Sequence, residues 1–442
     1  ISGENWLLIH LNLIFSIITY WLTISLIPKF KRRFIQKNLF GFDLHKVKGP
    51  KIPEAFGFIV GLTYLVTLFI FSAIAFRQSI LRITTFVESV AGLLCISCML
   101  MFGFADDVLD IPWRYKLLLP SIASLPLLMV YYVNFNSTTV ILPKFLRSTF
   151  GLSVNLGIFY YVYMGLLAVF CSNAINILAG INGLEAGQSL IIALSVCLFN
   201  IIEMFGEFWQ PHQFSLFFMI PFVSVTLALL KFNWCPAEVF VGDTYCYFAG
   251  MTLAVVGILG HFSKTLLLFF IPQIFNFLYS VPQLFHLFLN CVLFVLRLNE
   301  DKLLVASKVA FPKSELTLLG KFCIKILKIV KLLDSRESKD IMECNNLTLL
   351  NLVLIYSGPV REASLTKILL LIQVSISELF IIWMARVENH VSPLRCFRSY
   401  FIFQREASQL HSLKFAQNTL LKWRSKSRKF SRNYIASFQK EK

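Results

Sequence analysis

Residues 87–110 read VESVAGLLCISCMLMFGFADDVLD, an apolar stretch of membrane-spanning length that ends in three aspartates. Asp106, Asp107 and Asp110 lie so close together that their carboxylates repel one another. Holding them at a membrane edge costs on the order of several kcal/mol unless a positive group meets them. Mg²⁺ with a phosphate-bearing substrate is a common solution, because this ion binds carboxylates and completes its shell with phosphate oxygens. The run therefore predicts a metal and phosphate site, and the simpler alternative is a solvated acidic loop that caps a helix.

The composition of the whole chain indicates a membrane protein. Its 442 residues are 57% hydrophobic and 15% charged, with a mean hydropathy of +0.71. Soluble domains are nearer half apolar and about one quarter charged. Many apolar runs approach the roughly 20 residues that a helix needs to cross a bilayer. We therefore expect an all-α polytopic membrane protein with about ten transmembrane helices, at residues 7–27, 56–76, 87–105, 117–133, 156–172, 189–205, 214–230, 245–260, 266–289 and 365–385.

The placement of basic residues indicates which loops face the cytosol. The loop at 28–55 carries eight lysines and arginines, as the positive-inside rule requires of a cytosolic loop. A glycosylation acceptor pattern, with Asn136 as its acceptor, falls on the opposite face, where glycosylation is permitted. Because each span reverses the side of the membrane, every second loop lies on the same face as 28–55. The other unusual polar loops, at 106–116, 173–188, 231–244 and 290–364, are then all cytosolic. We therefore expect the active site on that face.

The net charge of +17 is unevenly distributed along the chain. Residues 391–442 hold twelve lysines and arginines against Glu406 and Glu441, and the remaining excess lies in short loops between spans. That pattern favours membrane topology over a nucleic-acid partner, which we do not expect. We divide the chain into a membrane domain at 1–385, with its long loop included, and a basic C-terminal extension at 386–442 to which we assign no function.

Further polar loops carry residues suited to a phosphate site. Lys116 could reach a phosphate from the head-group level, although an interfacial anchor would need no such role. Asn173 and Asn176 are one helical turn apart, so both amides can face the same site. Gly180 and Gly183 follow these asparagines, where they break the helix and permit close approach of the backbone to a ligand. These loops therefore add neutral and positive groups to the acidic run.

Two carboxylates elsewhere are weaker signals. Asp243 follows Gly242 at a predicted membrane edge and is a candidate metal ligand. Glu54 heads the second span, where the N-terminus of the helix already explains a negative charge.

Two other functions are compatible with the acidic run. Asp106 to Asp110 also spells D-D-x-x-D, a pattern of intramembrane prenyltransferases, which bind an allylic diphosphate between two acidic motifs. The opposing loop offers asparagines instead of a second acidic triplet, which disfavours that function. Intramembrane acids also mark the substrate paths of transporters, but the chain shows no internal repeat.

Four segments carry a resemblance to a known family. They are FGFADDVL at 102–109, the stretches 173–189 and 240–265, and ECNNLTL at 343–349. On these segments, and over roughly residues 7–385, the chain resembles the polyprenyl-phosphate N-acetylhexosamine-1-phosphate transferases, glycosyltransferase family 4. The last segment is distinctive of the eukaryotic branch of that family.

The resemblance implies a reaction and its partners. Members of the eukaryotic branch transfer GlcNAc-1-phosphate from UDP-GlcNAc to dolichyl phosphate, which gives GlcNAc-PP-dolichol and UMP in the first step of N-glycan precursor assembly. It therefore implies Mg²⁺ as the cofactor, endoplasmic reticulum membrane lipids as the surroundings and a multi-pass location with a cytosolic active site. It leaves a homodimer open.

The resemblance also implies roles for matching positions. The catalytic positions are Asp106, Asp107 and Lys116, and the metal positions are Asn176 and Asp243. The UDP-GlcNAc positions are Phe42, Asp43, Leu44, Glu54 and Asn182. The dolichyl-phosphate positions are Lys116 and the segment Val169, Phe170, Cys171, Ser172, Asn173, Ala174, Ile175, Asn176 and Ile177. Such transfer depends on positioning and charge neutralisation, and we expect Asp106 to orient the lipid phosphate electrostatically.

One segment departs from the family pattern. The family has Cys-Pro-Arg-His-Arg-Ile-Pro after the ninth span, whereas this chain has NCVLFVL at 290–296 and so lacks the Arg-His-Arg group at 292–294. Removing two cations from a pyrophosphate site weakens its charge-assisted hydrogen bonds. A catalytically impaired homologue that acts as a partner subunit is therefore the alternative to an active transferase.

Overall fold

The computed structural model describes residues 3–43, 50–77, 83–134, 138–141, 151, 153–206, 209–284, 296–301, 303–337 and 340–390. The chain divides into two compact units, one formed by Ile1–Leu128 with Tyr161–Ala385 and the other by Met129–Tyr160 with Arg386–Lys442. The larger unit contains every predicted site residue that the structure describes. Our division of the chain at residue 385 stays a prediction.

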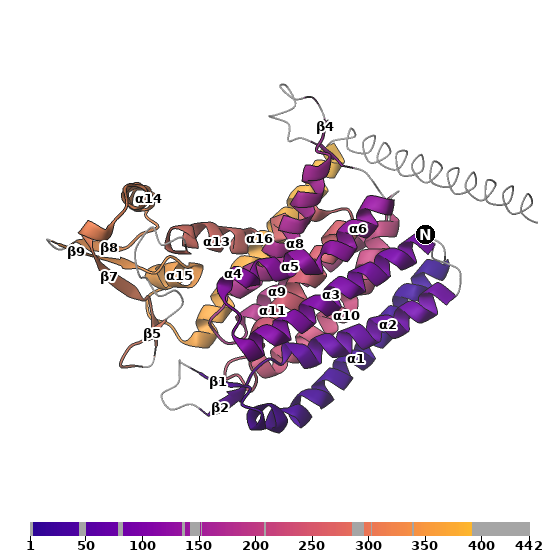
Figure 1. Cartoon of the computed structure of the whole chain (residues 1–442), viewed down its shortest axis with the longest axis horizontal. Coiled ribbons are helices and arrows are strands. Elements are labelled where there is room, and N and C mark those ends of the chain that lie inside the picture. Colours follow the sequence, from indigo (N-terminus) through magenta and orange to yellow (C-terminus); the bar gives the residue numbers. More distant parts are fainter. Residues whose placement is uncertain are drawn as a thin grey trace, which may run out of the picture. The chain divides into compact units, whose positions relative to one another are not determined.

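Transmembrane helices make up most of the larger unit. Among the described residues, nine helices are long and apolar enough to cross a membrane, and one bent pair brings the number up to ten. This confirms the all-α polytopic fold. The spanning helices are α1 (Gly3–Gln36), α2 (Gly57–Arg77), α3 (Ile83–Leu109), α8 (Ile158–Ile177), α9 (Leu184–Glu203), α10 (Trp209–Asn233), α11 (Gly242–Leu259) and α16 (Glu362–His390), with α4 (Trp113–Lys116), α5 (Leu118–Ala123) and α6 (Leu125–Asn134) forming the remaining span (Figure 1).

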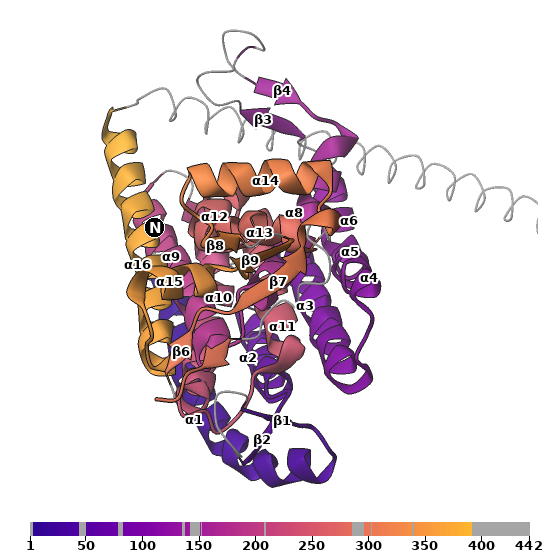
Figure 2. The ribbon, with the colours of Figure 1, turned by 90° about the vertical axis from the view of Figure 1, so that its left-hand side faces the viewer.

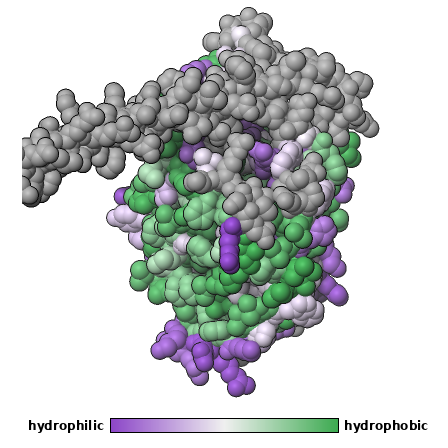
Figure 3. Space-filling view, turned by 90° about the vertical axis from the view of Figure 1, so that its right-hand side faces the viewer, coloured by the Kyte–Doolittle hydropathy of each residue, from purple (hydrophilic) through white to green (hydrophobic). Residues whose placement is uncertain are grey.

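Helix α11 forms the centre of this arrangement. Phe248, Leu253 and Ala254, on different sides of the helix, are all fully buried. A helix that is apolar all round is expected in the interior of a bundle. Helices α2, α3 and α10 pack against it, so the first turn of α11 meets the ends of several neighbours. Figure 3 shows a broad apolar surface band, with hydrophilic residues gathered at its lower end, as expected of helices that face lipid.

The ninth predicted span differs from its expected form. Instead of one helix over 266–289, the structure has α12 (Ser263–Phe269) and α13 (Ile271–Leu284), bent by 72° relative to each other. Pro272 cannot donate a backbone hydrogen bond to the preceding turn, which favours a break there. The carbonyl of Phe269 at the break accepts a 2.8 Å hydrogen bond from Gln373 Nε2 of α16. Residues 285–289 lie outside the described residues.

The long loop predicted at 290–364 contains a small folded domain. Strands β7 (Lys308–Pro312), β9 (Ile341–Asn345) and β8 (Ser335–Glu337) form an antiparallel sheet in that order. The sheet packs with α14 (Leu318–Ile329) and α15 (Leu349–Ser357) around a core that includes Phe311, Ile324 and Met342. A short pair, β5 (Arg297–Leu298) and β6 (Leu304–Val305), precedes it, and a 3₁₀ turn, η2 (Lys313–Glu315), follows β7. We call residues 296–357 the extramembrane domain.

Two short hairpins complete the described structure. In the larger unit, β1 (Phe40–Phe42) pairs with β2 (Lys51–Pro53). Helix α1 reaches that hairpin because it continues to Gln36 through Pro28, beyond the predicted end at residue 27. In the smaller unit, β3 (Thr139–Ile141) pairs with β4 (Ser153–Asn155).

Candidate active site

The site is built around the first turn of α11. The amide of Gly57 donates to the carbonyl of Val241 at 2.9 Å, and the amide of Phe240 donates to the carbonyl of Pro53 at 2.8 Å. These bonds fix the start of α11 against the chain between β2 and α2. Gly242 follows with a φ of +73°, and a Cβ there would meet the Asp107 carboxylate and the Ala55 Cα atom. Only glycine fits this position without strain, which explains the Gly-Asp pair in the sequence.

Asp107 binds the N-terminus of α11. Its Oδ1 atom accepts a 2.7 Å hydrogen bond from the Asp243 amide, and its Oδ2 atom accepts from the amide of Thr244 at 3.1 Å and from the Thr244 hydroxyl. The residue before α11, Val241, provides no side-chain cap. A carboxylate placed there satisfies free N–H groups and suits the positive end of the helix dipole. Asp107 therefore holds Asp243 in place from the neighbouring helix.

Asp106 points in a different direction and is deeply buried. Its Oδ1 atom accepts from the Ile111 amide at 3.1 Å, and its Oδ2 atom accepts from the Tyr247 hydroxyl at 2.9 Å. The same Oδ2 atom lies 2.9 Å from Lys116 Nζ. With its side chain wholly inaccessible to solvent, this carboxylate depends on these partners for its charge to be tolerated.

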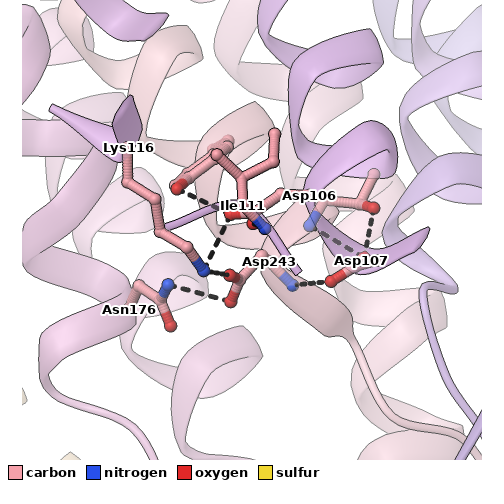
Figure 4. Close-up of polar contacts among 8 residues, drawn as sticks. Asp106, Asp107, Ile111, Lys116, Asn176 and Asp243 are labelled. Atoms are coloured by element: carbon pink, nitrogen blue, oxygen red, sulfur yellow. Dashed lines mark hydrogen bonds and ion pairs between the residues drawn. The ribbon is translucent and has the colours of Figure 1, made fainter. Parts of the chain in front are cut away.

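Lys116 connects the carboxylates that α3 and α11 contribute to the site. Its Nζ atom lies 2.7 Å from Asp243 Oδ2 and thus bridges the Asp106 and Asp243 carboxylates. Asp243 Oδ1 accepts a 2.9 Å hydrogen bond from Asn176 Nδ2 (Figure 4). Four predicted residues from α3, α4, α8 and α11 therefore meet in one cluster. Lys116 and Asp243 remain one quarter exposed, so a ligand can reach them.

The cluster fits the ligand preferences of Mg²⁺. The ammonium group of Lys116 occupies a position between two carboxylates, where positive charge is stabilised. Asp243 and Asn176 offer a carboxylate and an amide, both hard oxygen donors once the Asn176 amide turns its oxygen inward. Among the described residues, no group of three His, Cys, Asp or Glu side chains is arranged to hold a metal. A cation here would therefore need substrate phosphate or water oxygens to complete its shell.

Two predicted nucleotide-sugar residues also meet. Asn182 Nδ2 donates to Asp43 Oδ2 at 3.1 Å, and both residues are buried. The backbone of Asn182 is held from α16, because its amide donates to Glu362 Oε1 at 2.8 Å and its carbonyl accepts from the Thr366 hydroxyl at 3.0 Å. Phe42 lies on β1 with 57% of its surface exposed. Leu44 lies outside the described residues.

Glu54 lies at the edge of the cluster. Its backbone amide donates to the carbonyl of Leu39, which fixes it at the end of β2. Burial raises the pKa of the Glu54 carboxyl, and the negative charges of Asp243 and Asp110 raise it further. A fourth acidic group thus borders the same region as Asp106, Asp107 and Asp243.

The predicted lipid-phosphate segment on α8 has two faces. Cys171, Ser172, Ala174 and Ile175 are buried, and Gly250 of α11 packs against the backbone of Cys171 and Ser172. The other face remains partly accessible and carries Val169, Phe170, Asn173, Asn176 and Ile177. Only this second face can offer side chains to a ligand.

Several residues of the site were not predicted from the sequence. Tyr247 lies one turn after Asp243 and donates to Asp106, a spacing that could have suggested it. Gln188 donates to the carbonyls of Ile175 and Leu178 at 3.1 and 2.7 Å and so secures the backbone around Asn176. Because both are neutral residues inside apolar helices, no charge pattern pointed to them.

Four sequence-based predictions lie wholly or mostly outside the described residues. They are the glycosylation acceptor Asn136, the UDP-GlcNAc position Leu44, the replaced Arg-His-Arg group at 292–294 and the basic extension, of which 391–442 are not described.

Known proteins similar to this chain cover most of its length. The model of a protein family described as Glycosyl transferase family 4 matches residues 89–261 of this chain. A Saccharomyces cerevisiae protein named UDP-N-acetylglucosamine–dolichyl-phosphate N-acetylglucosaminephosphotransferase is 42% identical over 392 residues, which are 81% of this chain and 87% of that protein. A Dictyostelium discoideum protein of the same name is 41% identical over 397 residues, 84% of this chain and 87% of its own. Phospho-N-acetylmuramoyl-pentapeptide-transferase of Streptococcus thermophilus is 27% identical over 276 residues, 58% of this chain and 75% of its own.

Proposed function

Because the chain belongs to glycosyl transferase family 4, among its UDP-N-acetylglucosamine–dolichyl-phosphate N-acetylglucosaminephosphotransferases, we propose that it transfers GlcNAc-1-phosphate from UDP-GlcNAc to dolichyl phosphate. The products are GlcNAc-PP-dolichol and UMP. The observation that carries the proposal is Lys116, held between Asp106 and Asp243 beside Asn176. This cluster supports the proposal because it brings together one cation and several oxygen and amide groups that suit phosphate-bearing substrates.

The reaction is a displacement at phosphorus. An oxygen of the lipid phosphate attacks the β-phosphorus of UDP-GlcNAc, a new P–O bond forms, and UMP leaves with the electrons of the broken bond. A phosphate monoester has its second pKa near about 6, so it is already largely ionised at neutral pH. We therefore assign Asp106 to orientation of Lys116 rather than to obligatory removal of a proton, and Lys116 to contact with the lipid phosphate.

Mg²⁺ is the proposed cofactor, held by Asp243 and Asn176. Bound there, it would neutralise charge on the pyrophosphate of the nucleotide sugar. Asp107 keeps Asp243 at the start of α11 through three hydrogen bonds. Asp43 and Asn182, bonded to each other, are the proposed contacts of the nucleotide sugar, with Phe42, Leu44 and Glu54 nearby in the sequence.

The accessible face of α8 supports the approach of a polyprenyl chain. Val162 and Leu166 are 52% and 62% exposed, and they share a face with Val169 and Asn173 by helical spacing. This apolar row ends beside Asn176, at the cluster. We propose that the lipid follows this row, which presents its phosphate to Lys116.

The location is also part of the proposal. The basic residues that follow the apolar part of α1 favour a cytosolic position for that end, which is the end near β1 and β2. We propose an endoplasmic reticulum membrane protein whose reaction site faces the cytosol, where it would start the assembly of the N-glycan lipid precursor.

A direct assay tests the proposal. Membranes that contain the chain are incubated with labelled UDP-GlcNAc, dolichyl phosphate and Mg²⁺, and label is measured in the extracted lipid together with released UMP. We expect equal amounts of both products, loss of both on chelation of Mg²⁺, and recovery when the ion is restored. A folded chain that binds UDP-GlcNAc without labelling the lipid would instead support the impaired partner subunit.

A further inference from the structure

Helix α14 in the extramembrane domain has one face packed into the core of that domain. Gly320 and Ile324 are buried, and Cys323 and Leu327 pack against the same cluster. Thr317 caps its N-terminus by accepting a 3.0 Å hydrogen bond from the Gly320 amide. The helix is therefore a fixed part of the domain, and its orientation is set by the sheet beneath it.

The opposite face of α14 is also apolar, and it is exposed. Its side chains form a ridge with helical spacing, in which Leu318 is 87% exposed, Phe322 60%, Ile326 41% and Ile329 71%. Leu319 and Val330 widen this α14 ridge at its two ends. Contiguous exposed apolar patches of this kind mark surfaces that contact another apolar phase.

Lysines border the ridge. Lys321 and Lys325 are exposed along one flank, and Lys331 follows the helix. Lys328, on the same flank, is paired with Glu337 of β8 and so faces the sheet. An apolar face bordered by lysines is the pattern of helices that lie flat in the interface of a membrane.

The orientation of α14 agrees with such a position. Figure 1 views α14 almost along its axis, whereas α1, α3 and α16 are seen along their length, so α14 runs across the direction of the spanning helices. In Figures 1 and 2, α14 lies above the β7–β9–β8 sheet. Helix α16, which begins at Glu362, runs upward in the same two views. The sheet covers one side of α14, and the ridge therefore faces the layer that the spanning helices cross.

We propose that α14 lies in the head-group layer of the membrane on the side of the reaction site, with its ridge among acyl chains and Lys321 and Lys325 among anionic lipid phosphates. The extramembrane domain is then held to the bilayer at this helix as well as through α13 and α16. The inference depends on the spanning helices and on α14, and not on the transfer reaction.

Lipid explains the charge of this surface better than a second copy of the chain. In an antiparallel pair, two α14 ridges packed face to face would bring their lysine flanks together, and juxtaposed like charges disfavour association. Anionic head groups instead attract basic side chains near the surface, and the stems of lysines can lie along apolar chains while their ammonium groups reach the phosphates.

Lipid-based fluorescence quenching tests the position of the ridge. An environment-sensitive fluorescent amino acid replaces Phe322 in one full-length chain and the exposed Arg336 of β8 in a matched control, each placed in nanodiscs with one chain per disc. Lipids that carry a nitroxide near the head group are then added to the discs. We expect strong quenching at 322 and little at 336. Equal, weak quenching at both positions would overturn the proposal, as would quenching at 322 that requires two chains per disc.

A second comparison tests the charge. Discs of phosphatidylcholine alone are compared with discs that also contain phosphatidylserine, for the chain with its native lysines and for a Lys321→Gln, Lys325→Gln variant. Each basic residue near an anionic surface should shift the ratio of inserted to free α14 by about fivefold, so the anionic lipid should increase quenching at 322 only in the native chain. An anionic lipid that has no effect on the native chain would contradict the lysine contacts.

Discussion

The reaction site and the attachment of the extramembrane domain are both polar, but they use different kinds of group. The site joins Asp106, Lys116 and Asp243 through ion pairs. The attachment joins α13 to the segment after β9 through neutral side chains, with Ser280 donating to the Leu347 carbonyl at 2.6 Å and Gln283 accepting from the Leu347 amide at 2.9 Å. The polar contacts of the proposed reaction site are therefore ion pairs, whereas those of the attachment are hydrogen bonds between neutral groups.

One residue connects the two regions. Asn276 of α13 accepts a 2.8 Å hydrogen bond from the Leu349 amide and donates at 3.2 Å to the carbonyl of Ile177. Ile177 directly follows Asn176 of the site. The Asn276 amide therefore links the extramembrane domain to the end of α8, and substitutions at Asn276 can be compared with substitutions of the charged residues.

The largest effect is expected for Asp243→Ala. The change removes the carboxylate that accepts from both Lys116 and Asn176. Loss of one preorganised electrostatic group typically lowers turnover by about 10²- to 10³-fold, and loss of a metal ligand as well places this variant at the upper end. The lipid-labelling assay measures it, with Glu300→Ala in an exposed turn as the control. A folded Asp243→Ala protein with nearly full activity would refute the proposed role of the charged cluster.

Lys116→Met should have the next largest effect, about 10²-fold on turnover. It removes the ammonium group from between two carboxylates and takes away the proposed contact with the lipid phosphate. Saturation with dolichyl phosphate distinguishes the two consequences, because loss of a contact present in both ground and transition states raises KM alone. Lys116→Arg keeps the charge and should recover part of the activity. Equal loss in both variants would mean that the shape of the side chain, and not its charge, is decisive.

Asn276→Leu should have a smaller effect of a different kind. It leaves the Leu349 amide and the Ile177 carbonyl without this partner, and an unpaired buried group costs about 1–3 kcal/mol. We expect faster hydrogen exchange over residues 345–349 together with a loss of activity of about tenfold, the equivalent of 1.4 kcal/mol.

A matched variant separates the two bonds of Asn276. Asn276→Asp can still accept from the Leu349 amide but cannot donate to the Ile177 carbonyl. It should therefore keep slow exchange at 345–349 while losing activity. If instead activity follows exchange in both variants, the domain acts as a whole and the link to α8 is unimportant.

The sequence predicted the charged region better than the neutral one. Ionisable residues at the ends of apolar runs are rare enough to be recognised individually, and Asp106, Lys116, Asn176 and Asp243 do meet in the structure. It could not separate Asp106 from Asp107, because neighbours on a helix lie about 100° apart and face different groups. Asp106 consequently meets Lys116, whereas Asp107 meets the start of α11.

The neutral region offered no comparable signal. The spans were predicted from apolar length alone, but the bend before α13 depends on contacts such as Gln373 with the Phe269 carbonyl, which join residues far apart in the chain. The strands of the extramembrane domain are two to five residues long, too short for an alternating pattern to stand out. The role of Asn276 likewise depends on its hydrogen bonds to the Leu349 amide and the Ile177 carbonyl, which lie far from it in the sequence.

Glu54→Gln is expected to have the smallest effect, and it marks the outer limit of the charged region. Burial, followed by the charges of Asp243 and Asp110, raises the pKa of the Glu54 carboxyl above its usual 4.5. The folded chain therefore binds this proton more tightly than the unfolded chain. The stability that results is fully present below the unfolded pKa and is lost as the pH rises through the folded pKa. Glutamine carries no charge at any of these pH values, so the variant should melt above the native protein at alkaline pH.

The melting temperatures of Glu54→Gln and native protein should converge as the pH falls toward 4.5, the usual pKa of glutamate. Scanning fluorimetry of the full chain across this pH range measures the difference, with Glu300→Gln as the control in an exposed turn. Because Asp243 contributes to the shift, the gain at alkaline pH should be smaller when Glu54→Gln is made in the Asp243→Ala chain. A gain in melting temperature that does not depend on pH would mean that Glu54 contributes through packing and not through its charge. Glu54 would then belong with the neutral groups, and the charged region would end at Asp243.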